Sequence, residues 1–212
     1  FAEAFQIQFL SREGKLEYVH ETSWGVSTRL IGAIVMTHGD ERGLRLPPRV
    51  APIQVVILPI AQHKEGVLDR ARALAAELKA VGIRVELDDR DTYSAGWKFN
   101  EWEMKGVPVR LELGPRDIEN GVATFMRRDT LEKGTLPLEG IGDALKALLD
   151  DIHLTLYRQA DEFRKARTYT AVTLDELVEG VQDGFVKASW CGERDCEDKI
   201  KELTNASSRN MP

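Results

Sequence analysis

Residues 54–87 read QVVILPIAQHKEGVLDRARALAAELKAVGIRVEL and contain the strongest structural pattern in the chain. The apolar run at 54–59 is typical of a buried strand. Apolar side chains then recur at helical spacing from Val67 to Val81, and Gly82 follows where a helix would end. Alternating apolar residues at 83–87 predict a second strand. This strand–helix–strand order predicts a largely parallel sheet in an α/β domain.

The residues after 87 predict further strands of this sheet, followed by a long helix. A short helix is predicted near residues 97–105, and three further strands near 107–113, 122–127 and 133–138. Residues 141–167 then carry apolar side chains on one side of a long helix. At ~1.5 Å per residue this helix would span roughly 35–40 Å, enough to reach from one domain to the next.

The last part of the chain predicts a small α+β segment. Residues 171–172 and 186–190 have the composition of strands. Thr173 and Glu176 form the capping-box pattern of a helix start between them.

The first part of the chain has a different pattern. Alternating apolar residues at 5–9 predict a half-buried strand, and residues 16–20 predict its partner. The apolar run at 30–36 fits a buried strand or a buried helix. Ser27 or Thr28 could serve as an N-cap, which favours the helix.

Composition narrows the class of protein. The chain has 212 residues, 42% of them hydrophobic and 30% charged, without an apolar run long enough for a membrane span. Only two cysteines occur, which indicates a reducing, cytoplasmic compartment rather than a disulfide framework. The net charge of −6 gives no electrostatic sign of a nucleic-acid partner. Because residue 1 is Phe and no signal peptide is present, we expect the chain to begin within a longer protein. Three prolines and two glycines at 39–52 mark the clearest domain boundary.

Residues 22–29, TSWGVSTR, are a candidate phosphate site. A helix start offers free backbone N–H groups and partial positive charge, and Arg29 would add a planar fork of donors. From the residues alone, a structural or solvated arginine is the stronger alternative.

Charged and aromatic residues alternate at 88–103, directly before the segment 105–117. Aromatic rings can stack on unpaired bases, and arginine or carboxylate groups can bind base edges. The alternative is a salt-bridged surface in which Trp97, Phe99 and Trp102 anchor the core.

Cys191 and Cys196 are separated by four residues, at the edge of the spacing that zinc thiolates use. A structural zinc site needs four ligands, and all four histidines lie far away in sequence. The residues alone therefore favour two unligated thiols.

Taken together, four segments resemble the class II prolyl-tRNA synthetases, in their archaeal- and eukaryotic-like form. They cover nearly the whole chain in the family's order. ETSWGVSTR is similar to motif 3, and the stretch from THGD to LPPRVAP resembles the passage into the anticodon-binding domain. The others are GWKFN with KGVPVRLE and GPRD, and CGERDCE; the four segments span residues 21–29, 37–52, 96–117 and 191–197. Threonyl, histidyl and glycyl synthetases share the anticodon domain but are not expected to carry both SWG and GWKFN.

The resemblance implies an α/β architecture in four parts. Residues 1–48 would end an antiparallel-sheet catalytic domain. Residues 49–140 would form an α/β anticodon-binding domain with a mixed sheet flanked by helices. Residues 141–168 would form a connecting helix, and 169–212 an incomplete, small α+β domain of zinc-binding type.

The resemblance also implies an activity. ATP and Mg²⁺ would activate L-proline as prolyl-adenylate, and the prolyl group would pass to proline tRNA. Arg29, with Ser27 and Thr28, would bind ATP, since positioned cations stabilise charge on phosphate oxygens. Trp24 and Gly25 would lie on the floor of the proline pocket.

Three residues match the family positions that bind the two guanines shared by proline anticodons. They are Glu103, Arg110 and Arg116, and their chemistry suits guanine. Lys98 and Lys105 would add contacts to phosphates.

Zinc is implied for the full-length protein. Cys191 and Cys196 would supply half of a four-thiolate Zn²⁺ site, completed beyond Pro212. The resemblance also implies a homodimer without a membrane partner. Because motifs 1 and 2 and the proline-specificity loop are not in these residues, the chain alone is expected to be inactive. A non-catalytic anticodon-binding module or a synthetase-like regulator is the alternative.

Overall fold

The computed structural model describes residues 2–209. The chain divides between residues 36 and 37 into two compact units, which are described separately. Among the described residues, no helix has both the length and the apolar character needed to cross a membrane.

The first unit contains a short helix, a hairpin and most of a second helix. Helix α1 (Ala2–Phe5) precedes the antiparallel strands β1 (Gln8–Leu10) and β2 (Leu16–Tyr18), and helix α2 (Arg29–His38) follows. The predicted first strand starts later than expected, because Phe5 ends α1. The helix predicted at residues 30–36 is confirmed as α2. The predictions that this helix is buried and that the hairpin is half-buried are wrong, because none of the residues of α2, β1 or β2 is buried. Two strands alone cannot bury a face, and no other described strand pairs with them.

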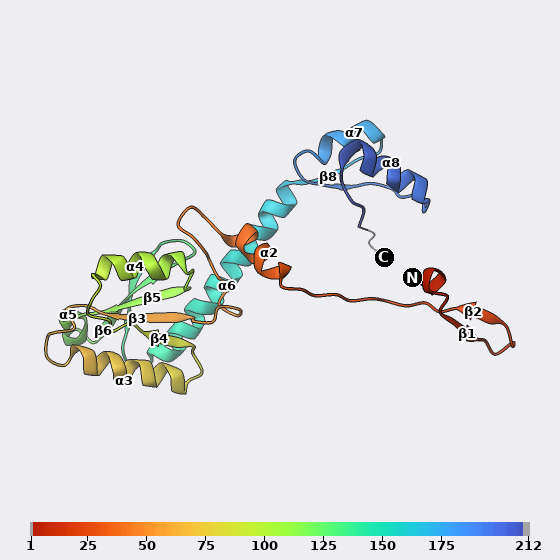
Figure 1. The fold of residues 1–212 in the computed structure, drawn as a ribbon. Helices are drawn as coiled ribbons and strands as arrows, with labels where there is room; N and C mark the ends of the chain where they lie inside the picture. The colour runs from red at the N-terminus through yellow and green to blue at the C-terminus, as the bar shows by residue number, and fades with distance from the viewer. Residues whose placement is uncertain (1, 210–212) are drawn as a thin grey trace. The chain divides into compact units, whose positions relative to one another are not determined.

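The second unit is built on a five-stranded mixed sheet with the order β4-β3-β5-β6-β7 (Figure 1). The central strand β3 (Val55–Pro59) pairs in parallel with β4 (Val85–Leu87) and β5 (Val109–Leu113). Strands β6 (Val122–Arg127) and β7 (Lys133–Pro137) continue the sheet antiparallel. Every residue of β3 and β5 is buried, which explains the unbroken apolar run of β3. The predicted mixed sheet is confirmed.

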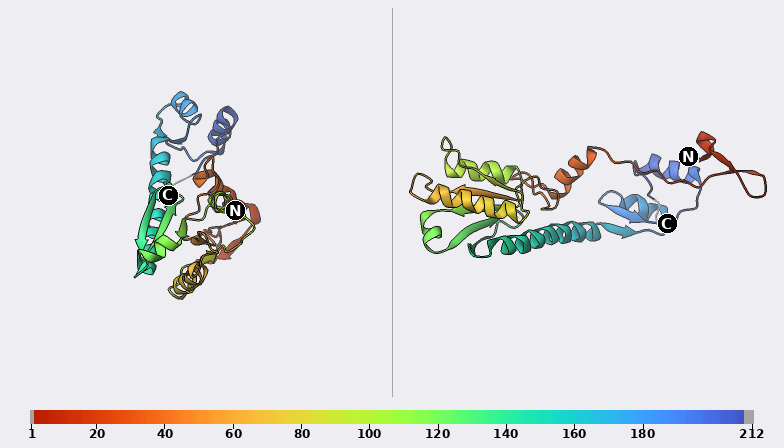
Figure 2. Two further views of the ribbon diagram at one scale, coloured as in Figure 1. Left: turned by 90° about the vertical axis from the view of Figure 1, so that its left-hand side faces the viewer. Right: turned by 90° about the horizontal axis from the view of Figure 1, so that it is seen from below.

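Helices cover the two faces of this sheet unequally (Figure 2). Helices α3 (Val67–Ala80) and α6 (Ile141–Ala166) pack against one face and form the main core with it. Helix α4 (Ala95–Met104) packs on the other face, against β3, in a smaller cluster that includes Trp102. The sequence predicted all three helices.

Helix α5 (Pro115–Glu119) was not predicted, because it is only five residues long. Its start nevertheless follows local rules. Pro115 occupies the first turn, where its lack of an N–H costs nothing, and Asp117 accepts from the backbone N–H of Gly114 (2.8 Å).

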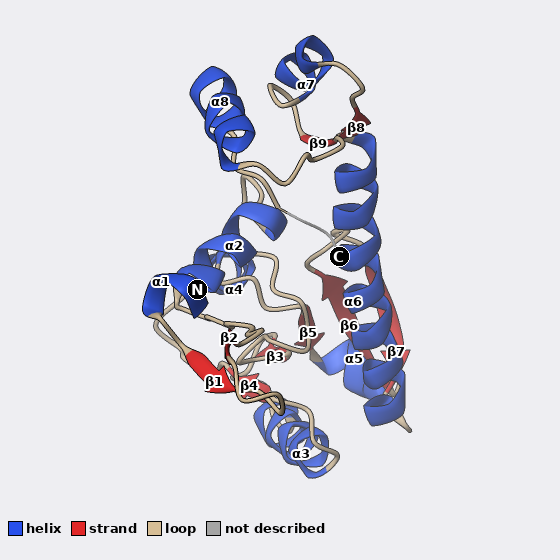
Figure 3. Ribbon diagram, turned by 90° about the vertical axis from the view of Figure 1, so that its right-hand side faces the viewer, coloured by secondary structure: helices blue, strands red, loops and turns tan. Residues whose placement is uncertain are grey.

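The last part of the chain forms a small parallel pair of strands with two helices. Strand β8 (Thr168–Thr170) pairs with β9 (Phe185–Lys187), and α7 (Leu174–Gly180) connects them (Figure 3). The capping box is confirmed: Thr173 and Glu176 exchange both hydrogen bonds. Strand β8 lies just before its predicted position, and helix α8 (Arg194–Thr204) was not predicted.

Candidate nucleic-acid interface

On the sheet face that carries α4, the helix packs against β3 and reaches β5, where Phe99 lies against Arg110. Alternation along each strand places Val109, Leu111 and Leu113 in the core, so Arg110 and Glu112 point to the opposite face. The strand register then aligns two rows of mostly polar side chains across the sheet. They consist of Arg110, Met126 and Lys133, and of Glu112, Thr124 and Thr135. We call these six residues the open face; Lys133 and Thr135 are exposed, whereas Arg110 and Glu112 are each only 9% exposed.

Ion pairs fix the charged groups of the open face. Arg110 donates to one oxygen of Glu112 through Nε (3.2 Å) and Nη2 (2.9 Å). Lys133 donates to the other oxygen (3.0 Å). The guanidinium of Arg110 also lies 4.0 Å from the centre of the Phe99 ring, so its plane is held by stacking. Its Nη1 has no hydrogen bond to any residue within 2–209, and it remains free for a ligand's acceptor.

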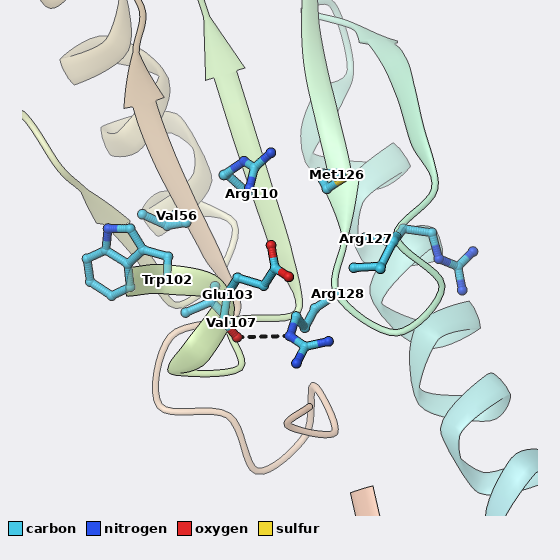
Figure 4. Close-up of a pocket in the computed structure, with 9 residues that line it drawn as sticks. Val56, Trp102, Glu103, Val107, Arg110, Met126, Arg127 and Arg128 are labelled. Atoms are coloured by element: carbon cyan, nitrogen blue, oxygen red, sulfur yellow. Dashed lines mark hydrogen bonds between the residues drawn. The ribbon is translucent and has the colours of Figure 1, made fainter. Parts of the chain in front are cut away.

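A hollow lies beside the open face, at the carboxyl end of α4. Its lining includes Glu103, Arg110 and Met126, with Arg128 at one end (Figure 4). Arg128 Nε donates to the backbone carbonyl of Glu103 (2.9 Å) and ties β6 to α4. The lining of the hollow therefore includes two of the three residues that the resemblance assigns to guanine, Glu103 and Arg110.

Residues 40–46 run along the carboxyl end of α4, and we call them the strap. The N–H of Leu44 donates to the carbonyl of Met104 (2.9 Å), and that of Leu46 to Gly106 (3.1 Å). The contact needs glycine: a Cβ on Gly106, where φ is +75°, would lie 2.6 Å from the Cβ of Leu44. The strap is thus fitted closely to the helix that carries Glu103.

Two arginines connect the strap to the hollow. Arg128 is buried and donates to both oxygens of Asp40 (2.6 and 2.8 Å). Donation from Arg128 lowers the pKa of the Asp40 carboxyl to about 2. Arg42 Nη1 donates to Glu103 Oε1 (2.9 Å). The carboxylate of Glu103 therefore already has a partner within the chain.

The other predicted contacts lie in different places. Lys98 is buried, with a side chain 6% exposed, and its ammonium donates to the backbone carbonyl of Asp88 (3.1 Å). Lys105 lies at the end of α4 over the ring of Trp102 and pairs with Glu101 (2.7 Å). Arg116 is exposed on α5, beyond the carboxyl end of β5.

The sequence left two roles open for the three aromatic residues of α4, anchoring the core or stacking on bases, and the structure places them differently. Trp102 is buried and donates to Asp88 (2.8 Å), and Phe99 packs beside it. Both anchor the core. Trp97 is partly exposed and stacks on Tyr93, with ring centres 3.9 Å apart.

Lys133 was not predicted as a site residue. It lies next to Arg110 only through the register of β5, β6 and β7. Its alternation with Thr135 on β7 could have placed it on the same face, but the pairing of the strands was needed to bring it to Arg110.

The structure brings the predicted ATP and proline residues together only in part. Ser27 Oγ accepts from the N–H of Arg29 (3.4 Å), which is the capping contact that the sequence predicts. Thr28 adjoins them at the start of α2. Trp24 is 91% exposed, and Gly25 has no atom within 4 Å of an added Cβ. Trp24 and Gly25 therefore form no enclosed pocket among the described residues.

Cys191 and Cys196 are exposed thiols. A hydrogen bond to Cys191 raises the pKa of the Cys196 thiol, so the two side chains are neighbours. Within residues 2–209, however, no group of three candidate ligands occurs. The pair fits half of a zinc site.

Comparison with known proteins matches two domains. A model of the anticodon binding domain matches residues 54–148, and one of the prolyl-tRNA synthetase C-terminal domain matches 174–212. Over its whole length the chain is 57% identical to a proline–tRNA ligase of Acetoanaerobium sticklandii. The identity is 54% to proline–tRNA ligase 2 of Clostridioides difficile and 52% to proline–tRNA ligase 2 of Bacillus cereus. The chain spans 44% of the length of each of these relatives.

The mixed sheet, its helices and the matched model together define an anticodon-binding domain of an aminoacyl-tRNA synthetase. The C-terminal match and the relatives specify which one. The chain belongs to the prolyl-tRNA synthetase family, of which it carries the anticodon-binding and C-terminal domains.

Proposed function

We propose that this chain reads the two guanines of proline anticodons for an enzyme that attaches L-proline to proline tRNA. The observation that carries the proposal is that Glu103 and Arg110 line the same hollow at the edge of the open face. Arginine donates well to guanine O6 and N7, and a carboxylate accepts from guanine N1 and N2. Arg116, beyond the carboxyl end of β5, and Lys133, in the same row as Arg110, would add cationic contacts. Because Lys98 is buried against Asp88, we do not include it among the direct contacts.

The rest of the activity belongs to the longer enzyme. That enzyme would use ATP and Mg²⁺ to form prolyl-adenylate and would transfer the prolyl group to tRNA. Arg29, with Ser27 and Thr28, would bind ATP; Trp24 and Gly25 would contact proline. Zn²⁺ would be held through Cys191 and Cys196 with two further ligands. The enzyme would act as a cytoplasmic homodimer.

Selective binding of an RNA hairpin tests the proposed function. The hairpin would carry a proline anticodon, UGG, and a matched one would carry UAA. We expect the 212-residue chain to bind the first at least about tenfold more tightly, because each wrong base costs roughly 1–3 kcal/mol. Fluorescence anisotropy at one fixed salt concentration would measure both dissociation constants. Equal affinity for the two hairpins would contradict the proposal.

The chain alone is expected to show no proline-dependent ATP–pyrophosphate exchange. In the described part of its first unit, the hairpin and α2 have exposed apolar side chains, and motifs 1 and 2, which the resemblance places in the catalytic domain, are not among these residues. A full-length relative provides the positive control in the same assay. Exchange by the purified chain above a no-enzyme blank would show that this reading of the first unit is wrong. If the full-length protein also failed, the non-catalytic alternative would gain support.

A further inference from the structure

The carboxylate proposed to read guanine is occupied by a side chain of the strap. Arg42 Nη1 donates to Glu103 Oε1 at 2.9 Å. The Arg42 side chain is 57% exposed, whereas that of Glu103 is 13% exposed. The Glu103 carboxylate therefore has little contact with solvent while Arg42 is paired with it.

Arginine and guanine present the same kind of donor group to a carboxylate. The Watson–Crick edge of guanine contains N1–H and the 2-amino group on one carbon, which is the arrangement of two N–H donors in a guanidinium. A carboxylate that binds one array can bind the other with the same oxygens. We propose that Arg42 is an internal stand-in for guanine: it occupies Glu103 in the free protein, and the anticodon displaces it. This inference rests on the proposed function for the role of Glu103.

Among the contacts of the strap, the one made by the Arg42 side chain is the easiest for a ligand to displace. Its side chain makes one hydrogen bond to Glu103, at the surface, and such ion pairs contribute little to stability. Arg128 and Asp40, by contrast, are joined by two hydrogen bonds, with Arg128 buried. Leu44 and Leu46 add backbone bonds to α4 and the loop after it. Guanine can therefore replace the Arg42 side chain while the strap stays in place.

The proposal predicts that loss of a surface arginine increases the affinity for RNA. Loss of a cation from a protein surface normally weakens RNA binding, because fewer phosphates are neutralised. Here Arg42→Ala removes a competitor for Glu103, so we expect the UGG hairpin to bind about two- to fivefold more tightly, the strength of a surface ion pair. Arg42→Met keeps the length of the side chain without its donors and should act in the same way. Arg49→Ala is the matched control, since Arg49 is exposed just beyond the strap and makes no ion pair with any described residue. It should leave binding unchanged or weaken it.

A double-mutant cycle on the 212-residue chain identifies Glu103 as the target. We expect Glu103→Gln to weaken binding of the UGG hairpin, and Arg42→Ala to give no gain in the Glu103→Gln background. Replacing both anticodon guanines by inosine, which lacks the 2-amino group, should also reduce the increase in affinity that Arg42→Ala causes. Thermal unfolding by circular dichroism would verify that each variant is folded.

The outcomes separate this inference from the proposed function. If the unsubstituted chain prefers UGG to UAA but Arg42→Ala and Arg42→Met leave affinity unchanged or reduce it, the inference is wrong and the function stands. A gain that persists in the Glu103→Gln background would also overturn the inference. If the unsubstituted chain does not distinguish UGG from UAA, the proposed function itself fails.

Discussion

Replacing Asp88 by alanine is expected to lower the free energy of unfolding of the anticodon-binding domain by about 3–5 kcal/mol, the cost of breaking a buried ion pair from one side. The Asp88 side chain is 1% exposed and accepts from four groups. Three belong to Arg90, namely its backbone N–H (3.3 Å), Nε (2.8 Å) and Nη2 (2.7 Å), and the fourth is Trp102 Nε1 (2.8 Å). The ammonium of Lys98 lies 3.6 Å away. Without this carboxylate, Lys98 would stay buried without its counter-charge, and the indole N–H of Trp102 would lose its acceptor.

The dependence on pH has a definite direction. Burial acts to raise the pKa of the Asp88 carboxyl, but donation from Arg90 and Trp102 and the charge of Lys98 outweigh it. The pKa in the folded protein is therefore held well below its usual value. At pH values above about 4, the usual pKa of a carboxyl group, ionised Asp88 therefore contributes fully to the stability of the folded protein. This contribution decreases as the pH falls below about 4 toward the lower pKa of the folded state.

Urea denaturation followed by tryptophan fluorescence would measure the effect of Asp88→Ala. Asp88→Asn keeps an acceptor for Trp102 but not the charge, so it should cost less than the alanine variant. Asp89→Ala is the matched control. Asp89 is a neighbouring residue whose pairing with Arg72 (3.3 Å) is solvent-exposed, and its loss should change stability by no more than about 0.5 kcal/mol. An effect of that small size for Asp88→Ala would show that the cluster is not needed for the fold.

The sheet could be predicted because its signals are local. Strands β3 to β7 and helices α3, α4 and α6 each follow from an apolar run or a period within one segment. Burial in the first unit could not be predicted in this way. Alternating apolar residues show which face would be buried, but not whether another element covers it.

The site could be predicted less completely than the fold, because its key contacts join distant residues. Lys98 resembles a solvated helix lysine in sequence, and only the packing of α4 on β3 buries it against Asp88. Arg42 and Glu103 are 61 residues apart, and no motif links them. Glu103 and Arg110 were assigned to guanine through the resemblance, since charge and spacing alone favoured a salt-bridged surface.

Arg110→Ala is expected to weaken binding of the UGG hairpin by about tenfold to a hundredfold, because one good bidentate pair to guanine is worth ~1–3 kcal/mol. The fold should tolerate the change. Glu112 would lose Arg110 but keep Lys133 at 3.0 Å, so its carboxylate would not be left unpaired. The loss should appear for the UGG hairpin and be small for the UAA hairpin, since Arg110 is proposed to read base edges. Arg116→Ala should shift selectivity in the same direction.

Two comparisons separate base reading from simple charge. Arg110→Lys keeps the charge but removes the planar fork that stacks on Phe99, so it should recover little of the selectivity. Lys105→Ala removes a surface cation outside the hollow and should weaken both hairpins alike, with a salt dependence smaller by about one phosphate contact. In the full-length enzyme, Arg110→Ala should raise KM for proline tRNA while ATP–pyrophosphate exchange stays nearly constant. Arg110→Ala could instead reduce the affinity for both hairpins equally, or reduce the rate of ATP–pyrophosphate exchange as much as the rate of tRNA aminoacylation. Either result would show that Arg110 stabilises the sheet through Glu112 and Phe99 rather than reading guanine.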